Sequence, residues 1–347
     1  MYSCRSPTKR PGVSAGPRFL RIGDNYSDVL NMLRHSKRQM SDSPTRILHF
    51  RHFAWPLIFV VLAAYAAVAM GKRPAAGDQE VVIVPVANMY SSATENTDVV
   101  SQAILGSDVV LLQVQKKWVK VRTPDQYTGW MPISDLRKWT GPHPYASEGR
   151  TVQVESLFAN VYRESDVTEH APLLTAPFES RLELSQADKD DKDGQGRWLQ
   201  IILPDGRAGW IQRSDVISNP APLTIEQSIE LAKRFMGLPY LWGGRSSFGY
   251  DCSGFTQMLV RSRGINMPRD ADLQAAWDGV VAVERNDLRA GDLLFFGSSV
   301  DKITHTGMYI GDGEFIHDTT HAHPVVQISR LDDQPWTHLL VACRRVK

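Results

Sequence analysis

The sequence contains little cysteine and no excess of one charge. Its 347 residues include only three cysteines, Cys4, Cys252 and Cys343, which are too few for a framework of disulfides. The 39 basic and 38 acidic residues leave a formal net charge of +1, so no basic excess indicates a nucleic-acid partner. These scarcities argue against a disulfide-stapled miniprotein and against a nucleic-acid-binding protein. The length is sufficient for about two or three domains.

Long apolar runs are also scarce, and the most prominent one lies near the N-terminus. Residues 1–39 carry scattered prolines and arginines, and we expect them to be disordered or not translated, with Met40 as the true start. Residues 40–70 combine a basic stretch, an apolar stretch and the small-x-small pattern Ala67-Val68-Ala69, which is typical of a signal peptide. An uncleaved membrane anchor is the alternative. We therefore expect export to the periplasm, cell envelope or exterior, with membrane contact only through this segment.

The middle of the chain contains an internal repeat. Trp118 and Trp130 are twelve residues apart, as are Trp198 and Trp210, and a glycine precedes the second tryptophan in both copies. Short alternating strands separated by glycine and aspartate turns predict small β-barrels, at residues 80–141 and 150–218. The second copy also carries an acidic stretch, residues 188–194, which does not match the spacing of a calcium loop and is interpreted as a solvated loop.

Cys252 has the sequence context of a nucleophile. It stands between an acidic residue and a run with helical spacing of apolar side chains, so it is expected in the first turn of a helix. Asp251 or Ser253 could cap that helix. The backbone N–H groups of a helix N-terminus favour an anion, and the thiolate is the reactive form of cysteine. A lone cysteine is otherwise a small buried hydrophobe, which is how we interpret Cys343 in its apolar terminal run.

Two histidines downstream could activate such a cysteine. His305 begins one predicted strand and His317 ends the next, with a glycine turn between them. A hairpin of this kind can place a base and the group that orients it against Cys252. We expect the Cys252–His305 pair to exist as thiolate and imidazolium, because each charge stabilises the other. A metal site built from His317, His321 and His323 is the alternative, but no metal is expected, because no acidic or cysteine partner stands at a fixed spacing.

The C-terminal part, residues 224–347, is predicted to be α+β. Thr224 and Gln227 fit a capping box that opens a helix after the stiff linker Pro220-Ala221-Pro222. The cysteine helix follows, and then come apolar strands, so helices are expected to pack on an antiparallel sheet.

Several blocks in this part together resemble the NlpC/P60 cysteine peptidases, which are papain-like enzymes that cleave bacterial cell-wall peptides. The blocks are Asp251-Cys252-Ser253-Gly254-Phe255, Pro268-Arg269-Asp270, Gly291-Asp292-Leu293-Leu294-Phe295-Phe296, His305-Thr306-Gly307-Met308-Tyr309-Ile310-Gly311 and Phe315-Ile316-His317. The resemblance implies that Cys252 is the nucleophile, His305 the base and His317 its orienting partner. It also implies that Tyr240 helps to hold the oxyanion and that no cofactor is needed.

The tandem barrels resemble bacterial SH3 domains, and the whole arrangement is similar to γ-D-glutamyl-diamino acid endopeptidases of cell-wall recycling. In those enzymes the first SH3 domain closes one end of the cleft, so that short peptides with a free N-terminal L-alanine are selected. The resemblance implies a set of substrate-binding residues: Tyr127, Trp242, Asp251, Ser253, Arg269 and Asp270. Two departures stand out, because Ser107-Asp108 replaces a frequent glutamate and Ala271 replaces a frequent serine. Amine recognition is therefore expected either to be reshaped or to depend on Asp108 and Asp270.

Two other functions remain open at this point. An acyltransferase or thioesterase could use the same fold, although paired SH3 domains suit wall peptides better. A non-catalytic wall-binding protein would not need the intact Cys252, His305 and His317. The expected substrate is a peptidoglycan peptide, whose diamino acid is either lysine or diaminopimelate.

Overall fold

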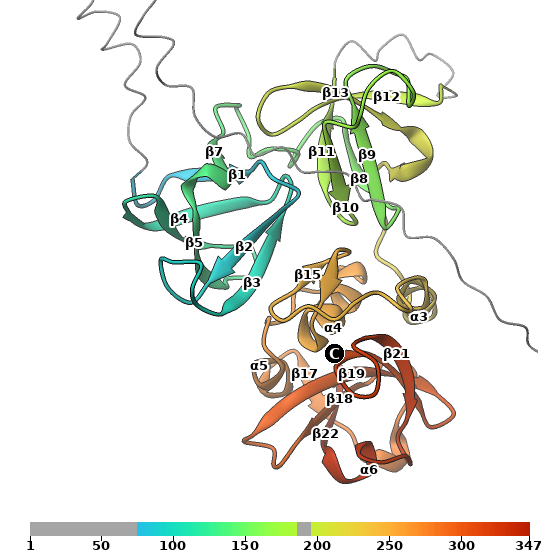
Figure 1. The fold of residues 1–347 in the computed structure, drawn as a ribbon. Coiled ribbons are helices and arrows are strands. Elements are labelled where there is room, and N and C mark those ends of the chain that lie inside the picture. The colour runs from blue at the N-terminus through green and yellow to red at the C-terminus, as the bar shows by residue number, and fades with distance from the viewer. Residues whose placement is uncertain (1–74, 186–195) are drawn as a thin grey trace, which may run out of the picture. The chain divides into compact units, whose positions relative to one another are not determined.

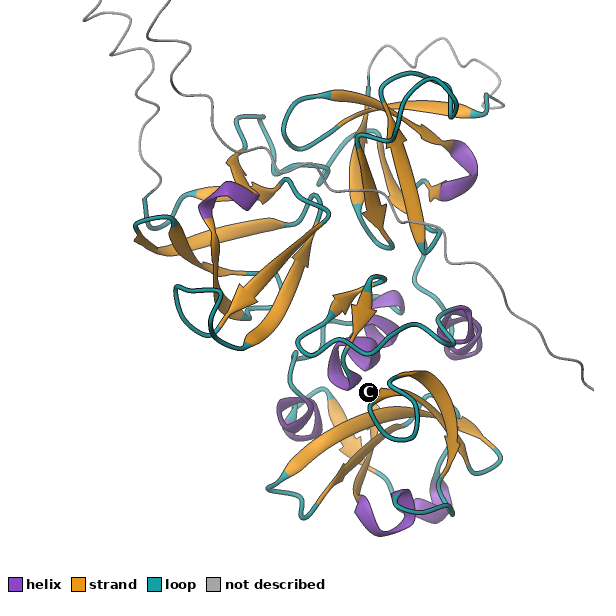
Figure 2. Ribbon diagram, viewed as in Figure 1, coloured by secondary structure: helices purple, strands orange, loops and turns teal. Residues whose placement is uncertain are grey.

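The computed structural model describes residues 75–185 and 196–347, which belong to one compact unit, Gly71–Lys347. The predictions for residues 1–39 and 40–70 and for the acidic stretch 188–194 lie outside the described residues. No helix within the described ranges is long and apolar enough to cross a membrane. Figure 1 labels the elements and Figure 2 shows that strands predominate over helices.

The first barrel is a seven-stranded sheet in the order β3-β2-β6-β5-β4-β1-β7. Its strands are β1 (Gln79–Val82), β2 (Val86–Tyr90), β3 (Val99–Ile104), β4 (Asp108–Gln115), β5 (Trp118–Arg122), β6 (Thr128–Pro132) and β7 (Leu136–Lys138). Alternate residues of these strands point into a core that includes Met89, Val119 and Met131, each fully buried. The period-two pattern read from the sequence is therefore the pattern that fills this core.

The second barrel repeats the first strand for strand. Its sheet has the order β10-β9-β13-β12-β11-β8-β14, which is the order of the first sheet with each number raised by seven. The strands are β8 (Thr151–Val154), β9 (Phe158–Tyr162), β10 (Leu174–Pro177), β11 (Arg181–Leu184), β12 (Trp198–Ile202), β13 (Ala208–Gln212) and β14 (Val216–Ile217). The repeated tryptophans thus occupy equivalent strands, β5 and β12, β6 and β13.

The C-terminal domain packs helices on a six-stranded antiparallel sheet of order β17-β22-β18-β19-β20-β21. The strands are β17 (Val280–Ala282), β18 (Leu293–Gly297), β19 (Ile303–Gly311), β20 (Glu314–Thr319), β21 (Val325–Arg330) and β22 (Leu340–Val346). The helices are α3 (Ile225–Arg234), α4 (Cys252–Ser262), α5 (Ala271–Ala276) and α6 (Trp336–Leu339), and a small ribbon pairs β15 (Arg245–Ser246) with β16 (Gly249–Tyr250). The predicted fold class, two SH3-like barrels followed by an α+β domain, is confirmed.

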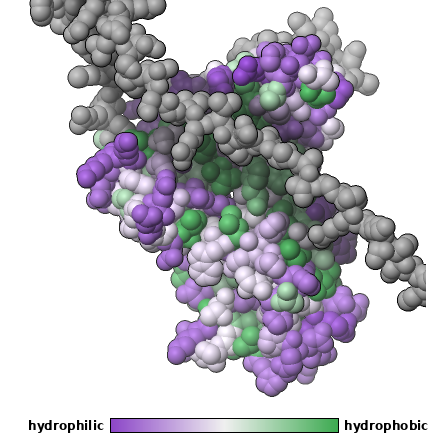
Figure 3. All heavy atoms as spheres, in the orientation of Figure 1, coloured by the Kyte–Doolittle hydropathy of each residue, from purple (hydrophilic) through white to green (hydrophobic). Residues whose placement is uncertain are grey.

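Local sequence signals explain where the first helix begins and what its domain encloses. Thr224 accepts a hydrogen bond from the backbone N–H of Gln227, whose side chain in turn accepts from the Thr224 N–H, so the predicted capping box is present. The core between helices and sheet includes Phe235, Phe255 and Phe295. On the face drawn in Figure 3, hydrophobic residues lie interspersed among hydrophilic ones. The precise ends of the three domains stay predictions.

Candidate active site

Cys252 is the first residue of α4, and its position follows from the cap before it. Asp251 is the N-cap, and its carboxylate accepts a hydrogen bond of 2.7 Å from the Gly254 N–H. Cys252 is 8% exposed, so the sulfur lies just below the surface at the positive end of the helix. The sequence left Asp251 and Ser253 open as caps, and the structure assigns this role to Asp251.

Arg269 locks Asp251 in place. Its two terminal nitrogens donate to both carboxylate oxygens of Asp251, at 2.9 and 2.7 Å, and one of them also donates to the Ser253 hydroxyl at 2.8 Å. Arg269 is only 2% exposed, and a buried guanidinium with a bidentate carboxylate partner is rigidly held. Arg269 therefore fixes the cap of the nucleophile helix, and among the described residues it is Asp251, and not the expected Arg269, that lines the pocket beside Cys252.

The β19–β20 hairpin brings the two histidines together. His305 Nε2 lies 2.7 Å from His317 Nδ1, and His317 Nε2 lies 3.0 Å from the hydroxyl of Ser329 on β21. His317 is fully buried, whereas His305 is half-buried. A continuous chain of hydrogen bonds therefore runs from Ser329 through His317 to His305, and it leaves His305 Nδ1 as the nitrogen for proton exchange.

The indole of Trp336 packs on both histidines. Its ring centroid lies 5.2 Å from that of His305 and 4.8 Å from that of His317. Trp336 is itself buried on α6, at the far end of the domain sequence. Sequence reasoning missed Trp336 and Ser329, because neither has a motif and both reach the histidines only through the fold.

The nucleophile and the base lie on elements in contact, α4 and β19. The backbone of Thr306, the residue after His305, acts to lower the pKa of the Cys252 thiol. Burial nevertheless raises the pKa of Cys252 to about 12, with the charge of Asp251 adding to the shift, and burial lowers the pKa of His305 to about 3. Desolvation therefore favours a neutral thiol and a neutral imidazole in the resting site. This differs from the thiolate–imidazolium pair expected from the sequence.

A pocket of about 490 Å³ opens in front of Cys252. It is lined by residues of the first barrel and of the C-terminal domain: Asp98, Val99, Val100, Tyr127, Tyr240, Trp242, Gly243, Asp251, Cys252, Ser253, Asp270, Ala271, Asp272, Ile303 and Thr304. The structure thus brings Tyr127, Tyr240, Trp242, Ser253 and Asp270 to one cavity with the nucleophile. Trp242 is 69% exposed and forms part of its rim.

The pocket is acidic on the side of the first barrel. The Tyr127 hydroxyl donates to Asp270 Oδ2 at 3.2 Å. Burial raises the pKa of Tyr127 to about 12, with Asp270 adding to the shift, so the phenol stays protonated and donates. Asp98 and Asp272 line the same cavity, and the sequence analysis singled out neither. No lysine or arginine of the described ranges lines this pocket, so the pocket suits a cationic ligand group.

Asp108 does not belong to this site. It begins β4, pairs with Val81 of β1 in register and lies beside Tyr145 and Glu183, away from the lining of the pocket. Burial raises its pKa to about 6. The expectation that Asp108 helps to recognise an amine is wrong, because the strand register directs it toward the second barrel. Asp98, on the loop between β2 and β3, lines the pocket instead.

Asp318 is a second acidic group buried behind the site. It follows His317 on β20, is fully buried and has no side-chain partner within the described ranges. Burial, with Asp251 as a further cause, raises its pKa to about 8, so it is mostly uncharged at neutral pH. Cys343 lies buried on β22 and is free, as is Cys252, in agreement with its predicted role as a strand residue. In residues 75–185 and 196–347, no group of three or more His, Cys, Asp or Glu side chains could hold a metal.

Two family models match the chain. The model described as the NlpC/P60 family matches residues 237–345, which include the cysteine and both histidines. The model described as the bacterial dipeptidyl-peptidase Sh3 domain matches residues 89–136, within the first barrel.

Relatives and a solved structure agree with these matches. A gamma-D-glutamyl-L-lysine dipeptidyl-peptidase from Bacillus cereus is 32% identical over 260 residues, which cover 71% of this chain and 74% of the relative. A protein of the same description from Bacillus subtilis is 30% identical and covers 71% and 80%. The crystal structure of an NlpC/P60 family protein from Bacillus cereus superposes with a TM-score of 0.66 at 27% identity, covering 78% of this chain and 99% of that one.

Proposed function

Because the chain belongs to the NlpC/P60 family of cysteine peptidases, we propose that it hydrolyses the amide between γ-D-glutamate and the diamino acid of peptidoglycan-derived peptides with a free N-terminal L-alanine. The observation that carries this proposal is the shared pocket. Cys252 faces a cavity to which the first barrel contributes Tyr127 and Asp98 and the C-terminal domain contributes Asp270 and Asp272. A nucleophile opposite a cluster of carboxylates suits a short peptide whose amine is charged.

The hydrogen-bond chain assigns the protons for catalysis. His305 accepts the thiol proton at Nδ1 only if its Nε2 carries a proton, which it donates to His317 Nδ1; His317 then donates its Nε2 proton to Ser329. The Cys252 sulfur attacks the amide carbonyl as His305 removes its proton, and a C–S bond forms. His305 returns the proton to the departing amine, and water then hydrolyses the thioester.

The negatively charged oxygen of the tetrahedral intermediate must be stabilised by hydrogen-bond donors. As the first residue of α4, Cys252 has a backbone N–H that no helical carbonyl can accept, and it points toward the end of the helix. Tyr240 lines the same pocket, and burial raises the pKa of its phenol, so it remains a donor. These two groups would stabilise the developing charge.

The carboxylates on the barrel side explain a requirement for a free amine. A charged ammonium group can donate to Asp270, to Asp98 and to Asp272, whereas an acetylated nitrogen has no charge to offset their mutual repulsion. The exposed indole of Trp242 offers a surface for the peptide at the rim.

Defined peptides test the proposal. The protein is incubated with L-Ala-γ-D-Glu-L-Lys, its diaminopimelate counterpart and the N-acetylated form of each, and products are identified by mass. We expect release of L-Ala-D-Glu from free-amine peptides and little from acetylated ones. Cleavage at another bond, or none in wild-type protein whose Cys252 is shown to be reduced, would contradict the proposal.

We also propose that the protein is exported, on the basis of the apolar segment and the Ala67-Val68-Ala69 pattern. N-terminal sequencing of the native protein should place the mature end shortly after Ala69. A mature chain that retains residues 53–70 in the membrane fraction would indicate an anchor instead.

A further inference from the structure

Tyr127 belongs to a tight turn between β5 and β6. The N–H of Thr123 donates to the carbonyl of Tyr127 at 3.0 Å, the N–H of Gln126 donates to the carbonyl of Thr123 at 2.9 Å, and Gln126 has a φ of +67°. The Thr123 hydroxyl donates to Asp125 Oδ1 at 2.5 Å. The turn is therefore ordered within itself, and Asp125 is its central polar side chain.

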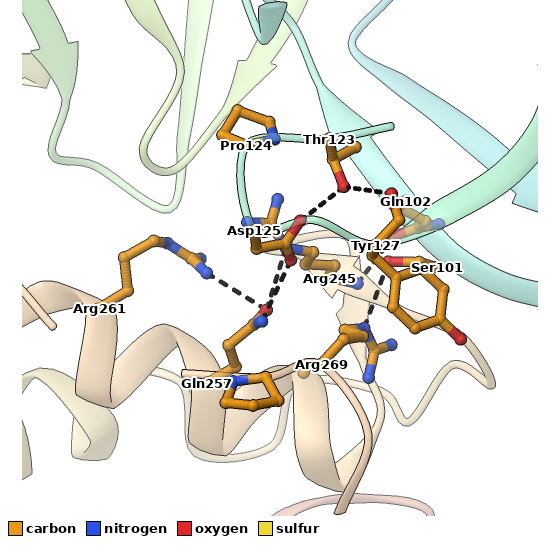
Figure 4. A network of polar contacts seen from close by, with 12 residues as sticks. Ser101, Gln102, Thr123, Pro124, Asp125, Tyr127, Arg245, Gln257, Arg261 and Arg269 are labelled. Atoms are coloured by element: carbon orange, nitrogen blue, oxygen red, sulfur yellow. Dashed lines mark hydrogen bonds and ion pairs between the residues drawn. The ribbon is translucent and has the colours of Figure 1, made fainter. Parts of the chain in front are cut away.

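The other carboxylate oxygen of Asp125, Oδ2, contacts residues of the C-terminal domain. Gln257 on α4 donates from Nε2 to Asp125 Oδ2 at 3.1 Å, and Arg245 Nε lies 3.7 Å from the same oxygen. Gln257 also accepts from Arg245 at 3.1 Å and donates to the Met267 carbonyl at 2.9 Å, so its amide cannot rotate freely. Figure 4 shows Asp125 directed toward Gln257 and Arg245, with Tyr127 on the same turn.

The contact between Asp125 and Gln257 connects the part of the pocket formed by the first barrel to the part formed by the C-terminal domain. Gln257 lies five residues after the nucleophile on one helix, and Tyr127 lies two residues after Asp125 on one turn. Tyr127 then reaches back to Asp270 of the C-terminal domain at 3.2 Å. The side chains of Asp125 and Arg245 are 9% and 12% exposed, and removing one member of such a pair leaves the other charge without compensation.

We propose that Asp125 is a positioning residue for substrate selection: it holds the Tyr127 turn on the nucleophile helix, so that recognition of the free amine depends on this contact between domains. The inference rests on the proposed function. Burial acts to raise the pKa of Asp125, but Arg245 and the hydrogen bonds from Thr123 and Gln257 outweigh it and hold the pKa below its usual range, so the anchor is charged at neutral pH.

The second barrel supplies a matched control. Asp205 occupies the equivalent turn, with Gly206 at φ +86° and the same backbone bonds between positions 203, 206 and 207. Its carboxylate, however, pairs with Arg207 of its own turn. Asp205→Asn therefore removes the same group from the same local structure without touching α4.

The test compares Asp125→Asn with Asp205→Asn by amide hydrogen exchange and by kinetics. For Asp125→Asn we expect exchange at residues 123–130 to accelerate by about fivefold or more. KM for the free-amine peptide should rise roughly three- to tenfold with kcat within about twofold, while the N-acetylated peptide is processed as by wild type. Asp205→Asn should leave both the exchange of 123–130 and KM unchanged.

The possible failures separate the proposed function from the positioning role of Asp125. If the wild type cleaves no wall peptide, the proposed function is wrong, and hydrogen exchange alone still tests whether Asp125 holds the Tyr127 turn. If wild type cleaves but Asp125→Asn leaves exchange and KM unchanged, or matches Asp205→Asn, the positioning role is wrong. Should Asp125→Asn fail to fold, Asp125→Glu keeps the charge and lengthens the arm. It must then shift KM for the free-amine peptide alone, and an unchanged KM overturns the inference.

Discussion

The two barrels have the same strand order and the same turn, yet only one of them contributes to the pocket. Position 127 is tyrosine in the first barrel, and the equivalent position 207 is arginine in the second. Asp125 contacts the nucleophile helix, whereas Asp205 contacts its neighbour in the turn. A duplicated scaffold has therefore diverged through the side chains of one turn and the surface that this turn meets.

The second barrel is attached to the catalytic domain by an aromatic contact and an ion pair. Phe158 packs on Phe248 with ring centroids 4.9 Å apart, and Arg261 donates to Glu179 at 2.5 Å. Among residues 150–185 and 196–218, the described part of this barrel, none lines the pocket. We infer that the first barrel determines substrate selection and that the second braces the domain.

The largest loss of activity should come from replacing the nucleophile or its base, and the effects of changes in the barrels are measured against it. Cys252→Ala and His305→Ala should each lower kcat by roughly 10⁴-fold or more without changing the melting temperature greatly, because neither group can be replaced in the proton and bond transfers. Steady-state cleavage of the free-amine peptide measures this. Substantial turnover by Cys252→Ala would show that another group attacks, and the pocket assignment would lose its basis.

The next effect concerns protonation, and neither barrel should alter it. With the pKa of Cys252 raised to about 12 by burial, the thiolate fraction rises about tenfold per pH unit. Alkylation by iodoacetamide should therefore accelerate continuously from pH 6 to 9, in the wild type and equally in the variants Tyr127→Phe of the first barrel and Arg207→Ala of the second. A rate that is level between pH 5 and 8 would indicate the thiolate–imidazolium pair instead.

Substitutions at the equivalent positions 127 and 207 test whether the turn of the first barrel alone contributes to substrate recognition. Tyr127→Phe removes the hydrogen bond to Asp270, which is worth about 0.5–1.5 kcal/mol or more with a charged partner. We expect a loss of roughly three- to tenfold in kcat/KM on the free-amine peptide and little loss on its acetylated form. Arg207→Ala should change neither. Equal losses on both peptides would remove Tyr127 from the amine site.

The smallest effect on catalysis should come from the attachment of the second barrel. The buried Ser247 hydroxyl donates to the carbonyl of Leu157 at 2.5 Å and accepts from the N–H of Phe178 at 3.0 Å. Ser247→Ala removes both of these hydrogen bonds, although the Phe178 N–H still donates to the Leu157 carbonyl at 3.1 Å, and it should lower the free energy of unfolding by about 0.5–1.5 kcal/mol, as measured by denaturant titration. The ratio of kcat/KM values for free and acetylated peptides should stay constant. A changed ratio would mean that the second barrel also shapes the pocket.

Local signals predicted the elements that carry the chemistry. The cap at Asp251, the capping box at Thr224 and the alternation in the hairpin of His305 and His317 each depend on neighbours within a few residues. Ser329, Trp336 and Asp98 could not be found this way, because only long-range packing brings them to the site. Asp108 was placed wrongly since sequence spacing does not give strand register, and spacing also does not give the burial that shifts the pKa of Cys252.

A crystal structure of the Cys252→Ala protein with L-Ala-γ-D-Glu-L-Lys bound tests the role of the first barrel most directly. We expect the scissile carbonyl next to residue 252 and Tyr240. The alanine ammonium should lie beside the Tyr127 hydroxyl and within about 3.2 Å of a carboxylate of the pocket, from Asp98, Asp270 or Asp272. An ammonium group left in solvent, or one bound by the second barrel, would contradict the claim that the first barrel selects the substrate.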